Sequence, residues 1–503
     1  MRDGATLSTD IYFPRRGCSG SALLIRTPYG KRRMYSLPVA LARNGYIVLM
    51  QDVRGRFSSG GDYEFAIREG LDGVDTVEWI RNQSWFDGGL GLIGPSYCGW
   101  AGLAAAVVKR KLFDAMVLIA APYDWYNVVY PSGVFQLHWA YPWAHQMSGK
   151  SASLSVLNKW PEEIPASLML DTWLEHREYD NYWQSRAIRF SDGLPSFPIL
   201  HIGGWYDFLL HEVLRGWELL GERANNRLVI GPWSHHTVLN PSTRLLDVDF
   251  GPHSELKLAE LAHKWFSACF SNSIHEAFPS KVQLFVTGRC EWKYCSYWNA
   301  YGKQVTFHTE RAGLGKEIPR AHSQRLFYSP SDPAPTLGGN CWPLPAIPGL
   351  NPGPAPQNSL VKRNDVACYF SRQLHEQVTC LGPVAFRLVA DSSGPMPIIL
   401  KLVELGQDGL IRLIATSEPA VLAEGRQSIS AEIKLVAHEF AAGNKIGIII
   451  QCGSFPRYER ILHECEVVIH HGIEGSCLHL TLCDGDTPSF QRQFMEVKDD
   501  ASY

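Results

Sequence analysis

Charge of one sign, long hydrophobic runs and paired-cysteine motifs are all scarce in this sequence. Its 47 Lys and Arg balance 50 Asp and Glu, for a formal net charge of −3. No long basic run occurs, so nucleic acid is not expected as a partner. The longest apolar runs, residues 115–121 and 446–450, fall far short of the ~20 residues of a membrane helix. A membrane is therefore not expected as a partner either.

The cysteines and the first residues of the chain bear on metal binding and on the cellular compartment. Twelve cysteines are scattered along the chain without a CxxC pair, and Cys290 with Cys295 has no matching Cys or His set downstream. A zinc site is therefore not expected. A signal peptide needs a basic stretch followed by an apolar one, whereas the chain opens Met1-Arg2-Asp3-Gly4 with mixed charge and a turn-forming residue, so no signal peptide is expected. We expect a cytoplasmic protein whose cysteines are reduced and mostly buried.

Short apolar runs alternate with helical stretches along the first 120 residues of this 503-residue chain. A half-buried strand with period two is predicted over 5–13, where it pairs antiparallel. After it, strands are predicted over 22–25, 46–50, 91–94 and 115–120, and helices over 35–44, 71–82 and 97–108. This alternation is typical of a parallel sheet covered on both faces, because parallel neighbours need crossover connections. The predicted fold class is α/β.

Two later parts of the chain change this pattern. Residues 121–194 lack the alternation and hold six of the sixteen tryptophans, so we predict an inserted helical cap there. The sheet then resumes with strands over 198–202 and 227–230 and helices over 208–220 and 255–269. Beyond it, short strands with Pro- and Gly-rich connections predict an antiparallel β-sandwich or jelly roll, with strands at 281–286, 305–308, 384–389, 398–402 and 429–436. The predicted domains are 1–120 with 195–275, 121–194 and 276–503.

The segment Gly94-Pro95-Ser96-Tyr97-Cys98-Gly99 lies between a predicted buried strand and a helix of small residues. A tight turn at this point holds a serine hydroxyl clear of the sheet, which makes Ser96 the candidate nucleophile. The usual motif has glycine two residues on either side of the serine, whereas Cys98 takes the second of these positions. From this motif alone, a serine that only caps the helix is an equal alternative.

A serine hydroxyl attacks carbonyls well only when a base takes its proton as the bond forms. His235, in Gly231-Pro232-Trp233-Ser234-His235, follows the last predicted strand of the sheet and is the candidate base, with His236 as a competitor. Asp207 follows the strand before it and is the candidate for orienting the histidine, with a helix-capping aspartate as the alternative. The chain order Ser96, Asp207, His235, each after its own strand, is typical of α/β-hydrolases.

Such a site also needs donors aimed at the alkoxide that develops during the reaction. The backbone N–H of Tyr97, next to the serine, is the first expected donor. The second comes from the loop after an early strand, Thr27-Pro28-Tyr29-Gly30-Lys31, where the Tyr29 phenol can donate. The predicted oxyanion hole is thus Tyr29 and Tyr97, with simple packing of Tyr29 beside the turn as the alternative.

Three segments together carry a resemblance to a known family: Gly94-x-Ser96-Tyr97-x-Gly99, Gly204-Trp205-Tyr206-Asp207 and Gly231-Pro232-Trp233-Ser234-His235. They resemble the motifs of the cocaine esterase and X-prolyl dipeptidyl peptidase family of α/β-hydrolase serine hydrolases, and the likeness covers nearly the whole chain. It implies an α/β-hydrolase domain, an inserted helical cap and a C-terminal jelly roll. It also implies the Ser96, Asp207 and His235 triad with the Tyr29 hydroxyl and the Tyr97 amide as oxyanion donors. The chain departs from the family at Gly30, at Cys98 and in its short aromatic cap, so the acyl pocket is not carried over.

We therefore expect a serine hydrolase that cleaves a small acyl ester or amide through an acyl-enzyme, closest to the cocaine-esterase-like carboxylesterases. No metal or organic cofactor is expected, because the triad needs none, and the aromatic cap favours an apolar or aromatic substrate. An X-Pro dipeptidyl peptidase stays open, with Glu162, Glu163 and Asp171 available to hold a free amino terminus. An acyltransferase or cyclase also stays open, as does a homodimer. An inert binding protein is the alternative of another class.

Overall fold

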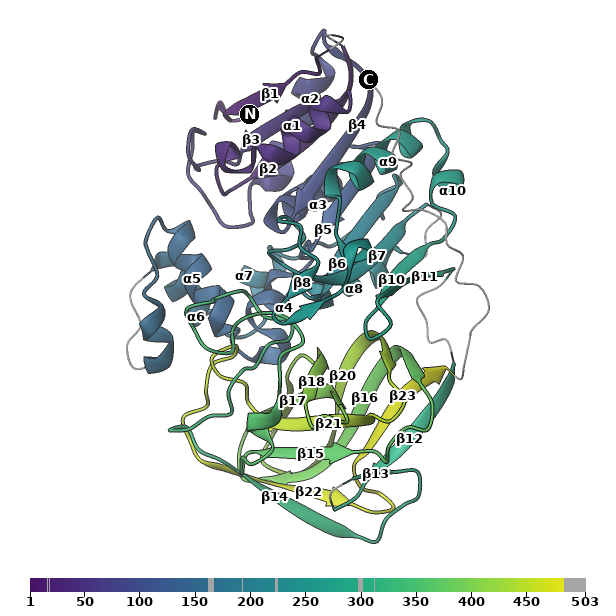
Figure 1. Ribbon diagram of the computed structural model, residues 1–503. Coiled ribbons are helices and arrows are strands. Elements are labelled where there is room, and N and C mark those ends of the chain that lie inside the picture. The colour runs from purple at the N-terminus through teal and green to yellow at the C-terminus, as the bar shows by residue number, and fades with distance from the viewer. Residues whose placement is uncertain are drawn as a thin grey trace. The chain divides into compact units, whose positions relative to one another are not determined.

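The computed structural model describes residues 1–15, 17, 19–161, 167–191, 193–221, 225–296, 302–311 and 313–483. The chain divides into two compact units, Met1–Asn240 with Lys257–Lys281 and Pro241–Leu256 with Val282–Tyr503 (Figure 1). Within the described ranges, no helix has both the length and the hydropathy needed to cross a membrane. The finer predicted boundaries at residues 121, 195 and 276 stay predictions.

A largely parallel sheet forms the centre of the first unit, in the strand order β1-β3-β2-β4-β5-β6-β7. The strands are β1 Thr9–Tyr12, β2 Gly20–Thr27, β3 Ile47–Asp52, β4 Phe86–Pro95, β5 Ala115–Ile119, β6 Ile199–Tyr206 and β7 Arg227–Ser234. β1 runs antiparallel to β3, and the other neighbours are parallel. β3, β5, β6 and β7 are buried along their whole length, as continuous apolar runs in a covered parallel sheet require. The predicted α/β sheet with an antiparallel first strand is confirmed.

The first strand is shorter than the predicted span of 5–13. Only Thr9–Tyr12 pair with β3. The Ser8 carbonyl still accepts the N–H of Asp52, the last residue of β3, at 3.1 Å, but Thr6 and the Ser8 N–H bond to a loop. The Gly60 N–H donates to the Thr6 carbonyl at 2.8 Å, and the Ser8 N–H donates to Ser59 Oγ at 2.9 Å. The alternating sequence pattern therefore continues beyond the paired strand.

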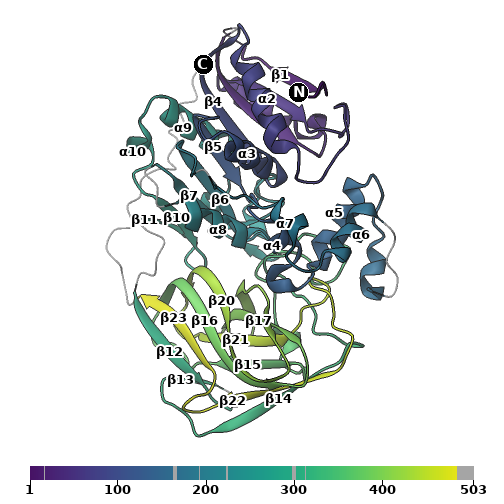
Figure 2. The same cartoon turned by 180° about the vertical axis from the view of Figure 1, so that it is seen from behind.

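Helices cover both faces of this sheet. α1 Ser36–Arg43 and α9 Leu258–Phe270 lie on one face (Figure 1), and α2 Glu69–Arg81, α3 Tyr97–Val108 and α8 Leu210–Leu220 lie on the other (Figure 2). Two further short helices, η1 Lys31–Met34 and α10 Ile274–Ala277, belong to this unit. The five predicted helices are confirmed with their ends shifted by at most three residues. These crossovers bring the carboxyl ends of β4, β6 and β7 to one edge of the sheet.

The segment between β5 and β6, predicted as an inserted cap, is helical. It contains α4 Trp125–Val129, η2 Pro131–Gly133, α5 Leu137–Met147, η3 Leu154–Lys159, α6 Leu168–Glu175 and α7 Asn181–Gln184. Its tryptophans are buried and stack on one another, with ring centroids 5.4 Å apart for Trp139 and Trp143 and 5.9 Å apart for Trp143 and Trp173. The aromatic residues are thus, first of all, the core of this helical segment.

Two antiparallel sheets form the body of the second unit. One has the order β13-β12-β23-β16-β22-β14 with β20 on β16, and the other has the order β15-β21-β17-β18 with β19 on β17. The elements of the unit are β8 Arg244–Leu245, β9 Val248–Asp249, η4 Pro252–Ser254, β10 Val282–Val286, β11 Glu291–Cys295, β12 Lys303–Thr309, β13 Leu314–Gly315, β14 His322–Tyr328, η5 Asn358–Leu360, β15 Val366–Phe370, β16 Val378–Ser392, β17 Met396–Leu405, β18 Ile411–Thr416, β19 Ala420–Leu422, β20 Gly425–Phe440, β21 Lys445–Cys452, β22 Cys465–His471 and β23 Cys477–Cys483.

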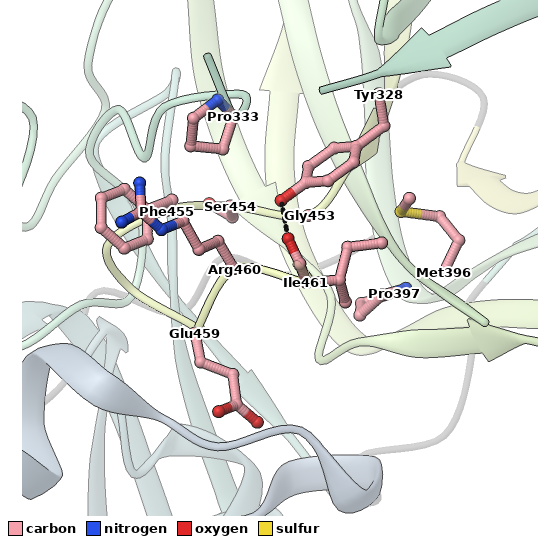
Figure 3. Close-up of a pocket in the computed structure, with 10 residues that line it drawn as sticks. All are labelled: Tyr328, Pro333, Met396, Pro397, Gly453, Ser454, Phe455, Glu459, Arg460 and Ile461. Atoms are coloured by element: carbon pink, nitrogen blue, oxygen red, sulfur yellow. Dashed lines mark hydrogen bonds between the residues drawn. The ribbon is translucent and has the colours of Figure 1, made fainter. Parts of the chain in front are cut away.

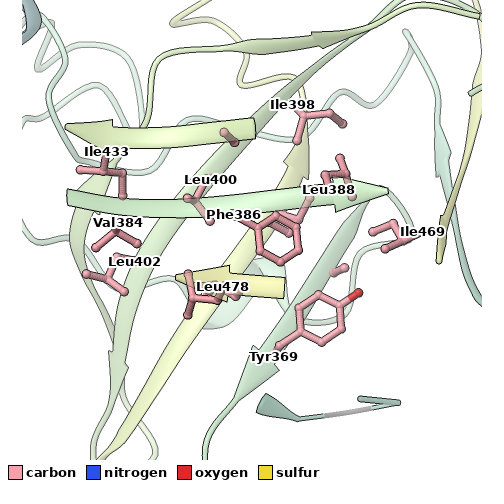
Figure 4. Close-up of a cluster of buried hydrophobic side chains, with 14 of the residues drawn as sticks. Tyr369, Val384, Phe386, Leu388, Ile398, Leu400, Leu402, Ile433, Ile469 and Leu478 are labelled. Carbon is pink, nitrogen blue, oxygen red and sulfur yellow. The ribbon is translucent and has the colours of Figure 1, made fainter. Parts of the chain in front are cut away.

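The two sheets share one hydrophobic core. Phe386 and Leu388 of β16 and Leu400 and Leu402 of β17 are fully buried in it (Figure 4). Because alternate residues of both sheets fill the same core, the sheets pack face to face. The predicted β-sandwich is confirmed.

One strand expected in the sandwich pairs elsewhere. The predicted strand 281–286 is β10, which forms an antiparallel hairpin with β11 and belongs to neither sandwich sheet. The turn between them, where Gly288 and Cys290 have positive φ angles, folds the chain straight back. The apolar pattern predicted the strand, but it carried no information about its partner.

Candidate active site

Ser96 sits at a sharp turn between β4 and α3. Its backbone has φ 53° and ψ −128°, a left-handed conformation that costs an L-residue free energy and persists only where the surroundings hold it. Its N–H donates to the carbonyl of Ile119, the last residue of β5, at 2.8 Å. The predicted strand, serine turn and helix are therefore present, with the serine in the strained conformation of a nucleophile elbow.

The glycines of this motif allow the strand and the helix to approach closely. A Cβ atom on Gly94 would lie 2.5 Å from the Cα of Gly99, and a Cβ atom on Gly99 would lie 2.6 Å from the Cβ of Ala121. Gly99 therefore makes the close approach to the strand that the second glycine makes in the usual motif, although it lies one residue later in the chain. Cys98 is fully buried, and burial raises the pKa of its thiol to about 12. Its thiol therefore stays protonated and does not compete as a nucleophile.

Asp207 and His235 follow β6 and β7 and meet at the carboxyl edge of the sheet. The Nδ1 atom of His235 lies 3.0 Å from Oδ2 and 3.1 Å from Oδ1 of Asp207. Asp207 is completely buried, and its Oδ1 also accepts the N–H of Leu209 at 2.8 Å. The carboxylate therefore both shapes the turn before α8 and fixes the imidazole. His236 is exposed and contacts Asn240 instead, so it does not compete with His235.

The two predicted oxyanion residues both lie next to Ser96. Tyr29 follows β2; its hydroxyl is hydrogen-bonded to the Ser96 side chain and accepts the Trp143 Nε1–H at 3.3 Å. Burial, the largest influence, holds the pKa of Tyr29 well above its ordinary value, so the phenol stays a donor. Tyr97 is the first residue of α3, and the N–H groups of a helix start have no carbonyl partner within the helix. Both donors thus lie at the serine.

Helix α5 of the cap contacts Tyr29 and also Phe208, the residue that packs on His235. Trp143 bonds to Tyr29, and Trp139, four residues earlier on the same helix face, stacks on Phe208 at 5.5 Å. Phe208 in turn lies 5.0 Å from the imidazole of His235. The spacing of the two tryptophans was visible in the sequence, but their partners were not.

A pocket in the second unit contains none of the predicted site residues. The Tyr328 hydroxyl donates to the Ile461 carbonyl at its wall, at 3.1 Å (Figure 3). The lining residues are Tyr328, Pro333, Met396, Pro397, Gly453, Ser454, Phe455, Glu459, Arg460 and Ile461. It contains no serine, histidine and aspartate set, so the candidate site remains the one at Ser96.

Comparisons with known proteins agree with this geometry. Residues 3–237 match the X-Pro dipeptidyl-peptidase (S15) family. Cocaine esterase from Rhodococcus sp. (strain MB1 Bresler) is 29% identical over 95% of this chain and 93% of its own length. An aminopeptidase from a marine sediment Thaumarchaeota archaeon superimposes with a TM-score of 0.81, and an α-amino acid ester hydrolase with 0.79; each is 19% identical and covers 96% of this chain and 95% of its own. At that identity the two structures bear on the fold alone.

The fold, with its strained serine turn, defines an α/β-hydrolase. The chain is an enzyme of the serine hydrolase class. It is similar to cocaine esterase over nearly its full length, and its first half resembles the X-Pro dipeptidyl-peptidase (S15) family, as its motifs indicated.

Proposed function

We propose that the protein hydrolyses carboxylic esters of small molecules through an acyl-enzyme. In this proposal Ser96 is the nucleophile, His235 the general base, Asp207 the residue that orients it, and Tyr29 and Tyr97 the oxyanion donors. The observation that carries the proposal is the Asp207–His235 pair, with 3.0 Å between Nδ1 and Oδ2, at the sheet edge where the strained Ser96 lies.

The proposed steps follow from this pairing. Because Asp207 accepts the Nδ1–H of His235, the neutral imidazole carries its basic lone pair on Nε2, which acts as the base. It takes the Ser96 proton as Oγ bonds to the acyl carbon, and the Tyr29 O–H and Tyr97 N–H stabilise the resulting oxyanion. The imidazolium then protonates the departing alcohol. Water, deprotonated by the same Nε2, attacks the acyl-enzyme and releases the acid.

An ester with an apolar or aromatic acyl group fits the surroundings of Ser96 best. Trp143 beside Tyr29 and Phe208 beside His235 surround the group with aromatic surface. Cocaine esterase, whose name states an ester substrate, is a relative over nearly the full length. These two observations support the aromatic preference that the sequence predicted.

The open alternatives differ in what they need near the site. An X-Pro dipeptidyl peptidase needs a carboxylate for a free amino terminus; Glu162 and Glu163 lie outside the described residues, and Asp171 is half-buried in the first turn of α6. An acyltransferase or cyclase needs an acceptor that outcompetes water. A cytoplasmic location and a homodimer stay predictions.

The test combines turnover with covalent labelling. Hydrolysis of p-nitrophenyl acetate, butyrate and benzoate is measured for wild type, Ser96→Ala and the exposed-serine control Ser271→Ala. Intact mass records fluorophosphonate labelling of each protein. Because Ser96 supplies the bonding oxygen, we expect Ser96→Ala to lose at least about 10³-fold in kcat and all labelling, while the control keeps both. An X-Pro-p-nitroanilide turned over faster than the esters would favour the peptidase.

A wild-type protein that neither turns over any of these substrates nor takes the label would contradict the proposal. The binding-protein alternative would then account for the chain better.

A further inference from the structure

A buried polar cluster lies directly behind the first residue of α3. The Tyr97 side chain is 0% exposed. Its hydroxyl donates to Oε1 of Glu69 and accepts the N–H of Ala66 at 3.2 Å. The residue whose backbone N–H is the proposed oxyanion donor is thus also held by its side chain, from a segment 28 to 31 residues earlier in the chain.

Glu69 is itself fixed to the sheet. It is the first residue of α2, and its backbone carbonyl accepts Nη1 of Arg26, from β2, at 2.6 Å. Arg26 Nε donates in turn to Oε1 of Gln51, from β3, at 2.9 Å. Glu69 and Arg26 are 3% and 1% exposed. A continuous chain of hydrogen bonds therefore runs from the centre of the sheet to the start of α3.

Burying this polar cluster costs desolvation free energy that an apolar core would not cost. Burial raises the pKa of Glu69, and among the described residues its Oε2 atom has no hydrogen-bond partner. Apolar side chains of the same size would fill the space without removing a carboxyl group from water. What they would not supply is a directional contact with the Tyr97 hydroxyl. Stability alone therefore does not explain the arrangement.

The directional contact of Tyr97 restrains the turn that contains the neighbouring Ser96. Ser96 has a φ of 53°, and a strained residue keeps its conformation only when it is held from both sides. Gly94 and Gly99 hold the turn against β4. The Tyr97 side chain, anchored on Glu69, holds it from the side of α2.

We infer that Glu69 is a positioning residue: through the Tyr97 hydroxyl it fixes the Tyr97 N–H as oxyanion donor and the Ser96 turn beside it. The inference rests on the proposed function. A displacement of a donor by about 1 Å is enough to slow a reaction by up to about 10²-fold. Substrate binding does not depend on this N–H to the same degree, because the alkoxide exists only in the transition state.

The test separates catalysis from folding. Glu69→Leu and Tyr97→Phe each break the contact, whereas Glu69→Gln keeps an acceptor oxygen for the Tyr97 hydroxyl. We expect the first two to lower kcat for p-nitrophenyl butyrate at least tenfold with KM within twofold. They should weaken inhibition by a trifluoromethyl ketone of the same chain length by a similar factor, because its hemiketal oxygen occupies the oxyanion hole. Glu69→Gln should stay within threefold of wild type.

A matched control tests whether lost stability explains the result. Asn226 is buried at the opposite end of β6; it accepts the Ile199 N–H at 2.9 Å and donates to the Leu220 carbonyl at 2.6 Å. Asn226→Leu removes these two buried hydrogen bonds and should keep kcat while the melting temperature falls. A Glu69→Leu or Tyr97→Phe protein with kcat within threefold of wild type would overturn the inference, as would an equal loss in Asn226→Leu. Should Glu69→Leu not fold, Tyr97→Phe decides alone. Failure of wild type to turn over would instead overturn the proposed function.

Discussion

Tyr29, the proposed oxyanion donor, is held in a fixed position. Its hydroxyl bonds to the Ser96 side chain and to the Trp143 indole, and burial keeps the phenol protonated. A hydroxyl held in place before the reaction needs no reorganisation when the alkoxide forms, and this is the main source of catalysis by an oxyanion hole.

The corresponding variant is Tyr29→Phe, which removes the hydroxyl and keeps the ring. We expect kcat for p-nitrophenyl esters to fall by about 10²–10³-fold, the usual effect of one oxyanion donor, with little change in KM. Tyr126→Phe is the control, because its hydroxyl donates to the Arg177 carbonyl at 3.1 Å and its ring stacks on Tyr130 at 5.6 Å. A kcat of Tyr29→Phe close to wild type would mean that the second donor is another group.

At the scale of elements, helix α5 joins the cap to the site. Trp139 and Trp143 lie one turn apart and reach Phe208 beside His235 and Tyr29 beside Ser96. A shift of this helix would therefore disturb His235 and Tyr29, the proposed base and oxyanion donor, together. We expect changes in α5 to alter the rate as well as substrate binding.

Trp143→Phe tests this link, because it keeps an aromatic ring and removes the N–H that bonds to Tyr29. We expect kcat to fall by about fivefold, the rate equivalent of ~1 kcal/mol for one hydrogen bond. Trp160→Phe serves as the control, since that ring stacks on Phe135 at 5.5 Å within the cap. A change in KM alone in Trp143→Phe would show that α5 acts only on binding.

At the scale of the whole molecule, a buried lysine makes stability depend on pH. Lys401 of β17 is 2% exposed, and its Nζ donates to Oε1 of Gln357 at 3.0 Å. Burial lowers its pKa from 10.5 to about 7. Between pH 7 and 10.5 the unfolded chain therefore binds a proton that the folded chain has largely released. The free energy of unfolding rises with pH across this window, by at most about 1.4 kcal/mol per pH unit from this group.

Lys401→Met removes that dependence while roughly keeping the volume. We expect the variant to be more stable than wild type at pH 7, and we expect this advantage to shrink by about 2 kcal/mol as the pH rises to 9. Calorimetry at pH 7, 8 and 9 gives the difference between the two melting curves, and the exposed Lys303→Met is the control. A difference that stays constant with pH would show that Lys401 does not release its proton in the folded state.

Much of the secondary structure followed from local sequence. α3 begins and ends where its pattern predicted, and β5 differs by one residue. The sequence predicts that Asp207 and His235 lie together because each follows a strand of one parallel sheet, and their side chains are in contact. The roles of these residues in catalysis remain predictions, since position in a motif does not measure chemistry.

What the sequence by itself determined is the order of strands and helices, the covered parallel sheet and the residues that collect at its carboxyl edge. The spacing of apolar residues and the glycines at turns depend on only a few neighbouring residues, so both can be recognised in the sequence. Only the tertiary structure decided that Gly99 packs on Gly94, that β10 leaves the sandwich, and that Trp143 reaches Tyr29 across 114 residues. Such contacts depend on how separate elements pack in three dimensions, and the local pattern of neither partner encodes that packing.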